Sequence, residues 1–144
     1  MAYFSEAMPA PHPNFDDRDF WAACAEKRLQ FQACAECSTA RHPPTPVCPR
    51  CRSFKVTWKL TAGRAEVYTH TTVHHASHEA VKPNLPYVVA VVTFPDVPGV
   101  RLVTNVTDID PKEVRIGMEL ALWWDVIDGG MHIPRFKPAS SSSA

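Results

Sequence analysis

Four cysteines in two closely spaced pairs give the clearest indication of a metal site in this chain. Cys34 and Cys37 are separated by two residues, ten residues follow, and Cys48 and Cys51 repeat the spacing. Zinc is bound tetrahedrally by four thiolates at about 2.3 Å, and a two-residue gap lets one tight turn direct both sulfurs at the same ion. A site closed by four thiolates leaves no position for water or substrate. The spacing therefore predicts a structural zinc ion, and function must be sought elsewhere.

Two disulfides, or one redox Cys-x-x-Cys pair beside a coincidental second pair, are the alternatives. A redox pair is expected between a strand and a helix of a βαβ unit, and no such pattern surrounds these cysteines. The fifth cysteine, Cys24, is unpaired, which favours a reducing compartment. The sequence shows no secretory signal, and no segment reaches the roughly 18 apolar residues of a membrane span. We therefore expect a cytoplasmic protein without a membrane partner.

The elements that must position the cysteines are a short helix and two strands. Acids followed by an apolar edge and then basic residues predict a helix of about three turns from Asp16 to Arg28. Its Phe20 and Trp21 either pack on the body of the chain or bind another protein. Cys24 on the same side is interpreted as a small buried hydrophobe and not as a nucleophile.

Strands are expected on both sides of the cysteine region. Alternation at 29–33 predicts a strand that leads into the first cysteine pair. At 54–60, apolar residues alternate with Lys55, Thr57 and Lys59 in strict period two. This pattern predicts a strand that buries its apolar face and exposes its polar face.

The second half of the chain is dominated by strands. β-branched, aromatic or alternating runs predict five of them, at 65–73, 87–94, 100–106, 119–126 and 131–136. A helical turn at 110–115 begins with a proline after the third strand. Five antiparallel strands with this insertion predict an OB-type barrel, and a β-sandwich is the alternative. The predicted organisation is mainly β: an extended segment at 1–15, helix and zinc ribbon at 16–61, an OB-fold at 62–138, and a disordered tail at 139–144.

Charge is distributed unevenly along a chain whose net charge is zero. Residues 1–24 carry one basic and four acidic side chains, residues 25–64 carry eight and two, and residues 65–144 carry six and nine. The cysteine region is therefore positive between two negative segments. Such a patch suits nucleic acid, a phosphorylated cofactor or an acidic partner, and a solvated face explains it equally well.

Two other groups of polar residues are candidates for a metal or carboxylate site. The first is a histidine-rich loop, and imidazole binds zinc or iron, but the loop has no predicted rigid support. The second is a set of acids that is better explained by capping of the helical turn. These groups are His74, His75, His78 and Glu79, and Asp108, Asp110 and Glu113. The sequence shows no Ser-His-Asp set and no glycine-rich phosphate loop, so we predict no catalytic residue.

A series of short phrases in fixed order resembles the DUF35 family, which joins a rubredoxin-like zinc ribbon to an OB-fold. The resemblance covers roughly residues 16–138, and the ordered set is more specific than any single phrase. The phrases are Phe20-Trp21, the two cysteine pairs, Arg41-His42-Pro43-Pro44, Gly63-x-x-x-Val67-Tyr68, Pro86-Tyr87-Val88-Val89-Ala90 and Val114-Arg115-Ile116-Gly117-Met118.

The resemblance implies a non-catalytic accessory subunit of an enzyme complex that acts on coenzyme A thioesters. Members of the family pair with thiolases, including the benzoylsuccinyl-CoA thiolase type, and with thiolase-like aldolases of steroid side-chain degradation. Others pair with MaoC-like hydratases or with acyltransferases. A thiolase or thiolase-like aldolase is therefore the expected partner, and a hydratase or acyltransferase complex is the alternative. Zinc is the implied structural metal, and coenzyme A is a candidate ligand at the partner interface.

Arginines of the positive region are candidates to meet that coenzyme A. Guanidinium groups suit phosphate oxygens, so Arg41, Arg50 and Arg52 are possible phosphate ligands, with partner salt bridges as the alternative. An OB-fold also fits nucleic-acid binding. Against that function, the predicted barrel is net negative and its aromatic residues lie within apolar runs that are typical of a core.

Overall fold

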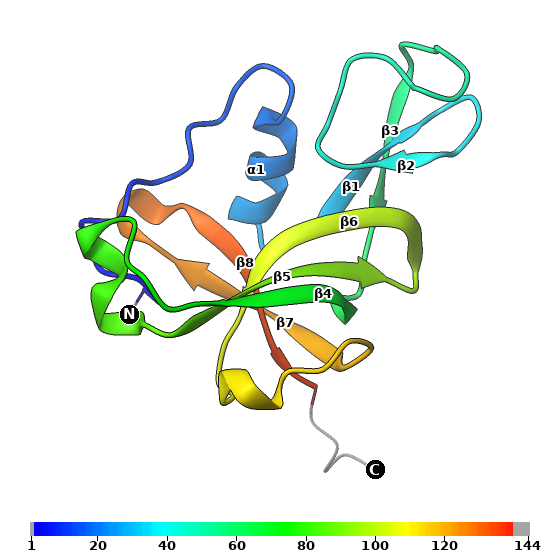
Figure 1. Ribbon diagram of the computed structural model, residues 1–144. Coiled ribbons are helices and arrows are strands. Elements are labelled where there is room, and N and C mark those ends of the chain that lie inside the picture. Colours follow the sequence, from blue (N-terminus) through cyan, green and yellow to red (C-terminus); the bar gives the residue numbers. More distant parts are fainter. Residues whose placement is uncertain (1, 140–144) are drawn as a thin grey trace.

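The computed structural model describes residues 2–139 and consists of a small ribbon module beside a closed β-barrel (Figure 1). A helix, α1 (Arg18–Ala25), precedes a three-stranded antiparallel sheet in the order β2-β1-β3. Its strands are β1 (Gln30–Cys34), β2 (Ala40–Arg41) and β3 (Val56–Leu60). The tail predicted to be disordered spans 139–144, and all of it except residue 139 lies outside the described residues.

Five strands close the barrel in the order β4-β5-β6-β8-β7, and β4 pairs with β7. They are β4 (Arg64–Val73), β5 (Tyr87–Phe94), β6 (Val97–Val106), β7 (Glu119–Val126) and β8 (His132–Pro138). Three short 3-10 helices, Glu79–Asn84, Pro111–Glu113 and Asp128–Gly130, lie in the connections. The predicted class, a mainly β chain with a zinc ribbon ahead of a five-stranded OB-type barrel, is confirmed.

One continuous core joins the ribbon module to the barrel. Phe31 of β1 packs against Phe20 of α1 at 6.3 Å between ring centroids and against Phe94 of β5 at 4.9 Å. Phe94 in turn contacts Phe136 of β8 at 5.8 Å. All four rings are buried. The helix is therefore held to the barrel by aromatic packing that runs through β1.

The link from β3 to β4 is fixed by polar contacts. The Asp96 carboxylate accepts hydrogen bonds from the Thr61 hydroxyl at 2.7 Å and from the Ala62 amide at 2.8 Å. Gly63 follows with φ +93°, and a Cβ at this position would lie 3.0 Å from the Cβ of Leu122. A glycine is required here because the backbone is left-handed and lies close to β7.

The helix is shorter than the sequence pattern predicts. It ends at Ala25, and Lys27 adopts a left-handed φ of +60° while its amide donates to the Cys24 carbonyl at 2.8 Å. The predicted basic last turn is therefore a closing turn outside the helix. None of the helices in the described part of the chain has the length and apolarity that crossing a membrane requires.

The prediction that β3 buries its apolar face is wrong. Phe54, just ahead of the strand, is 75% exposed, Leu60 is 61% exposed and Val56 is 43% exposed. The register places Lys59 opposite the buried Phe31, so the polar side chains of β3 lie on the face turned toward the core. The period-two alternation is correct, but of its apolar residues only Trp58 is partly buried and packs against the core, whereas the others are turned outward.

Residues 2–14 contain no helix or strand and run along one end of the barrel (Figure 1). The Tyr3 amide donates to both carboxylate oxygens of Asp125 at 3.2 and 3.3 Å, and the Asn84 side chain donates to the Tyr3 carbonyl at 2.8 Å. Phe4 is buried and meets Tyr87 edge to face at 5.2 Å. The segment predicted only as extended is therefore anchored on the barrel.

Candidate functional site

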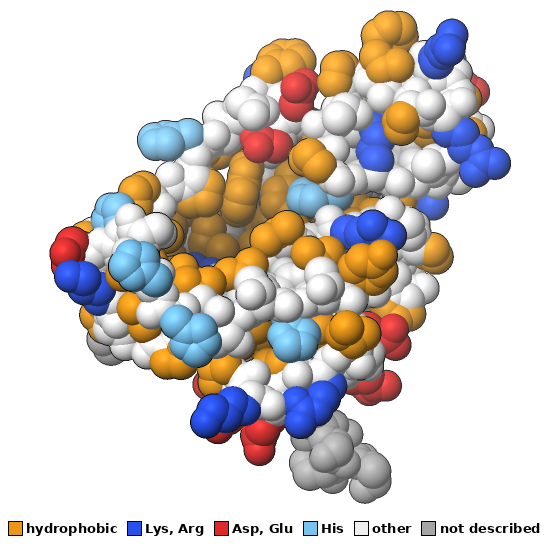
Figure 2. Space-filling model, viewed as in Figure 1, with side chains coloured by type: hydrophobic (Ala, Val, Ile, Leu, Met, Phe, Trp, Pro, Cys, Tyr) orange, Lys and Arg blue, Asp and Glu red, His pale blue; other side chains and the backbone are white. Residues whose placement is uncertain are grey.

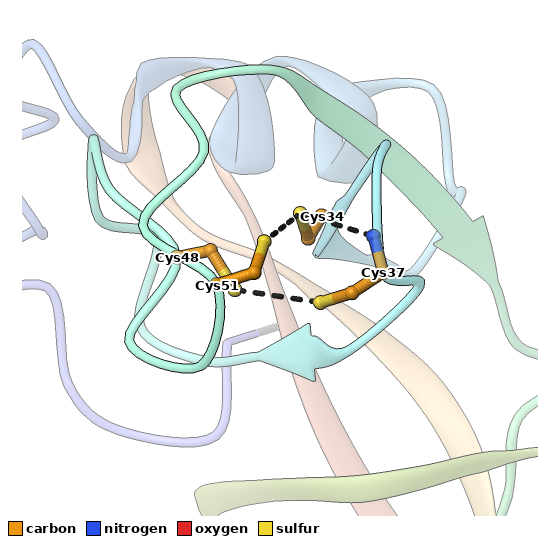
Figure 3. Close-up of side chains that lie close together, drawn as sticks. All are labelled: Cys34, Cys37, Cys48 and Cys51. Atoms are coloured by element: carbon orange, nitrogen blue, oxygen red, sulfur yellow. Dashed lines mark hydrogen bonds between the residues drawn. The ribbon is translucent and has the colours of Figure 1, made fainter.

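The four cysteines come from two turns of similar construction (Figure 3). In the first, the Cys34 amide donates to the Thr39 carbonyl and the Ser38 amide donates to the Cys34 carbonyl, both at 2.9 Å. In the second, the Cys48 amide donates to the Ser53 carbonyl and the Arg52 amide donates to the Cys48 carbonyl, also at 2.9 Å. Ser38 and Arg52 both have left-handed φ, +66° and +64°. Each turn therefore directs its two sulfurs to the same side.

The four sulfurs meet in one cluster. All Sγ atoms of Cys34, Cys37, Cys48 and Cys51 lie within 4.8 Å of one another. Across the two turns, Cys34 and Cys51 are 3.4 Å apart and Cys37 and Cys48 are 3.7 Å apart, and none of the four forms a disulfide. Four sulfurs at about 2.3 Å from a central tetrahedral ion would be separated by about 3.8 Å. The cysteines are therefore positioned to bind one metal ion, which argues against both disulfide alternatives.

The surroundings of Cys34 and Cys37 favour the thiolate form that metal binding requires. At Cys51 the backbone hydrogen bond at Ser53 lowers the pKa, but the side chains of the neighbouring cysteines outweigh it and the pKa is raised to about 12. The amides of Glu36 and Cys37 donate to the Cys34 sulfur at 3.3 and 3.4 Å. The pKa of the Cys37 thiol is lowered to about 6, first by its 3.2 Å hydrogen bond with the Thr39 hydroxyl and then by the Thr39 backbone. The donor set and its hydrogen bonds thus fit a soft four-thiolate metal such as zinc.

The three candidate arginines lie in different environments. Arg41 is buried on β2, where Nε and Nη2 donate to the hydroxyl and carbonyl of Thr45, both at 3.0 Å. Arg50 and Arg52 are exposed beside the second cysteine pair. Only the latter two are therefore placed where a phosphate in solvent could reach them without rearrangement.

The two aromatic residues of α1 have separate roles. Phe20 is 3% exposed and lies between Trp21 and the aromatic core. Trp21 is partly buried and lines a cavity between α1 and the barrel. Phe20 also lines this cavity, but Trp21 exposes the larger surface of the predicted pair to a ligand or partner.

The other polar groups are structural where the structure describes them. The Asp110 side chain accepts from the Lys112 amide at 3.0 Å and caps the helix Pro111–Glu113, as expected. The His78 ring accepts from the Ala80 amide at 3.0 Å and caps Glu79–Asn84. Among the described residues, the four-cysteine cluster is the sole group with metal-ligand geometry. Cys24 is fully buried, and burial raises the pKa of its thiol to about 12, which disfavours a nucleophilic role.

Comparison with known proteins assigns the chain to a family. The family described as ChsH2, rubredoxin-like zinc ribbon domain matches residues 21–57, and ChsH2, C-terminal OB-fold domain matches residues 58–125. A solved structure titled Ltp2-ChsH2(DUF35) aldolase contains a chain that is 40% identical, with a TM-score of 0.82. The match covers 91% of this chain and 100% of that one. The protein belongs to the DUF35 family.

Two curated relatives extend the comparison of this DUF35 chain. A probable enoyl-CoA hydratase alpha subunit of Thermomonospora curvata is 41% identical over 131 residues, which are 91% of this chain and 40% of that protein. A DUF35 domain-containing scaffold protein of Methanocaldococcus jannaschii is 32% identical over 88 residues, which are 60% of each chain. The chain thus spans less than half the length of the hydratase subunit that it matches.

Sequence reasoning missed two surfaces of this DUF35 protein. The first is the apolar row of β3, defined here as Phe54, Val56 and Leu60. Its alternation was visible, but period two does not state which face meets the core. The second is the cavity beside Trp21, which is formed by segments far apart in the chain and has no local sequence signal.

Proposed function

We propose that this DUF35 chain is a non-catalytic accessory subunit of a complex that processes coenzyme A thioesters, with a thiolase or thiolase-like aldolase as its partner. The observation that carries the proposal is the exposed apolar row of β3. Two large apolar side chains on an edge strand, with a third just ahead of it, are unusual for a free surface and typical of a protein interface. The similarity to a chain of an aldolase complex supports the same role.

The row has the features of a strand that binds a partner. β3 is at the edge of its sheet, so within the described residues its outer backbone edge has no paired strand. Lys55 and Arg52 lie beside the row and are exposed. A partner segment with apolar residues and an acidic border would match this surface in both respects.

Zinc is proposed as the ion held by Cys34, Cys37, Cys48 and Cys51. Bound there, zinc would supply a cross-link between the two turns and no open position for catalysis. The turns connect β1 to β3 with only the two-residue β2 between them, so they have little packing of their own. The cluster would therefore fix the shape of the surface that carries Phe54. Reduced cysteines of this kind suit the reducing conditions of the cytoplasm.

Coenzyme A contact is proposed for the exposed Arg50 and Arg52, which stand on the second cysteine turn close to the apolar row. At a partner interface, these guanidinium groups could bind the phosphates of the cofactor. Arg41 would contribute by holding the loop at Thr45, because its hydrogen bonds are made inside the protein.

A hydratase complex is the second candidate function. It is favoured by the name of the Thermomonospora curvata relative, a probable enoyl-CoA hydratase alpha subunit, of which this chain matches 40%. The remaining part of that relative has no counterpart in the residues compared. A hydratase partner would therefore have to supply the catalytic residues from another chain.

Affinity purification from the native host, followed by mass spectrometry of the co-eluting protein, tests the proposal. A thiolase-like protein in a fixed ratio to this chain is the expected result, and a hydratase would select the second candidate. The variant Phe54→Ser, in the apolar row, should lose the co-eluting protein. Elution of the chain alone at native concentrations, or turnover of acyl-CoA thioesters by the chain by itself, would contradict the accessory role.

A further inference from the structure

A cavity of about 670 Å³ lies where the ribbon module, the N-terminal segment and the barrel meet. Figure 2 shows this face hollowed, with apolar side chains lining the hollow. Phe4 and Met8 come from the N-terminal segment, Trp21 from α1, Pro44 from the loop after β2, and Val89 and Val103 from β5 and β6. The volume lies within the 300 to 1,000 Å³ that small-molecule sites usually occupy.

The cavity is lined by one strong hydrogen-bond donor that is nine-tenths buried, Arg135 of β8. Its Nε donates to Asp125 at 2.6 Å and its Nη1 donates to the Asn105 side chain. The rings of Phe4 and Tyr3 lie against the guanidinium, at 5.1 and 5.4 Å. Among the described residues, Nη2 has no acceptor, so its N–H groups remain for a molecule in the cavity.

The charge of this arrangement restricts the ligand. The side chain of Asp125 is fully buried and pairs with Arg135, so the two charges cancel. Asp17 and Arg101, at the solvent-accessible part of the lining, add one further charge of each sign. A carboxylate placed beside them would bury an extra negative charge without compensation, which is costly in an apolar site. A neutral carbonyl oxygen needs only the free N–H donors. The ligand that fits is an apolar body that bears one uncharged carbonyl.

We propose that this cavity binds the acyl group of a thioester, with the thioester carbonyl accepting from Arg135. The inference rests on the proposed function, because coenzyme A thioesters are the substrates of the complex suggested there. The enclosed, unpartnered Nδ1 of His42, which also lines the cavity, would meet a second polar atom of a longer acyl group. The accessory chain would then bind part of the substrate as well as the partner.

Calorimetric titration of the metal-loaded full-length chain tests the inference without coenzyme A. The probes are S-(2-methoxyethyl) octanethioate and the matching 2-methoxyethyl octyl thioether, which lacks any carbonyl. We expect saturable one-to-one binding of the thioester and about tenfold weaker binding of the thioether, the difference that one hydrogen bond to a charged donor makes.

Two matched variants locate the binding. Val103→Glu places a charge on the cavity wall at a side chain that is 67% exposed, so folding should be unaffected, and thioester affinity should fall at least tenfold. Ile116→Glu makes the same change at a residue 71% exposed and outside the cavity lining, and affinity should be unchanged.

Three results would overturn the inference: no saturable thioester binding, equal affinity for thioester and thioether, or wild-type affinity in Val103→Glu. If Val103→Glu instead prevents co-purification with the partner and the wild-type chain does not bind the thioester, the cavity is a protein-docking surface. Those results leave the accessory role intact, because that role is tested separately by the identity of the co-eluting protein.

Discussion

Replacement of Phe54 by serine measures how much the apolar row of β3 contributes to partner binding. The ring is 75% exposed in this chain, which corresponds to about 150 Å² of apolar surface available for burial. At about 25 cal/mol per Å², with allowance for incomplete burial, the loss is about 2 to 3 kcal/mol. The dissociation constant for the partner should therefore rise about 30- to 150-fold.

The assay is a titration of the purified partner with each variant, alongside urea unfolding of the variant alone. Ile116→Ser is the control, because Ile116 is 71% exposed but lies between Val114 and β7, away from the row. Both variants should unfold within about 0.5 kcal/mol of wild type, as surface substitutions usually do. Equal partner affinity for Phe54→Ser and wild type would refute the assignment of β3 as the interface.

Three further predictions concern the metal centre, a buried ion pair and a buried histidine. Removal of the metal with a chelator should abolish amide protection in the two cysteine turns but not in the barrel, as measured by hydrogen exchange. Unchanged protection in the turns after metal removal would contradict a structural role. Asp125→Asn leaves Arg135 without its carboxylate partner and should lower the free energy of unfolding by about 3 to 5 kcal/mol. The control is Glu119→Gln, which breaks an exposed ion pair with Arg64 and should lower the free energy of unfolding by less than about 1 kcal/mol. Burial lowers the pKa of His42 from its ordinary value of 6.5 to about 4. Between these two pH values, His42 is protonated in the unfolded chain but not in the folded chain. Stability should fall by about 1 kcal/mol from pH 7.5 to 5.5 in urea unfolding, and this extra loss should be absent from His42→Leu.

Local signals in the sequence were sufficient for the cysteine turns and the barrel strands. A Cys-x-x-Cys pair requires its geometry within four residues, and the structure forms that turn twice with matching hydrogen bonds at Cys34 and Cys48. The strands β4 to β8 follow runs of β-branched and aromatic residues, and Asp110 caps the helical turn that its position indicated.

Features that depend on contacts between distant segments could not be predicted. The pairing of Lys59 with Phe31 decides which face of β3 is exposed, and period two leaves that choice open. The burial of Arg41 depends on the loop at Thr45. The cavity needs residues from the N-terminal segment, α1 and three barrel strands, and Arg135 gave no local signal of its role.

We propose that this DUF35 chain supports the chemistry of a partner and performs none itself. Reconstitution with the co-purified partner tests it most directly, with thioester turnover measured for each chain alone and for the two together. We expect no turnover by this chain, low or unstable turnover by the partner, and full turnover on mixing. Turnover by the metal-loaded chain alone, abolished by a substitution within it, would show that the chain is itself an enzyme.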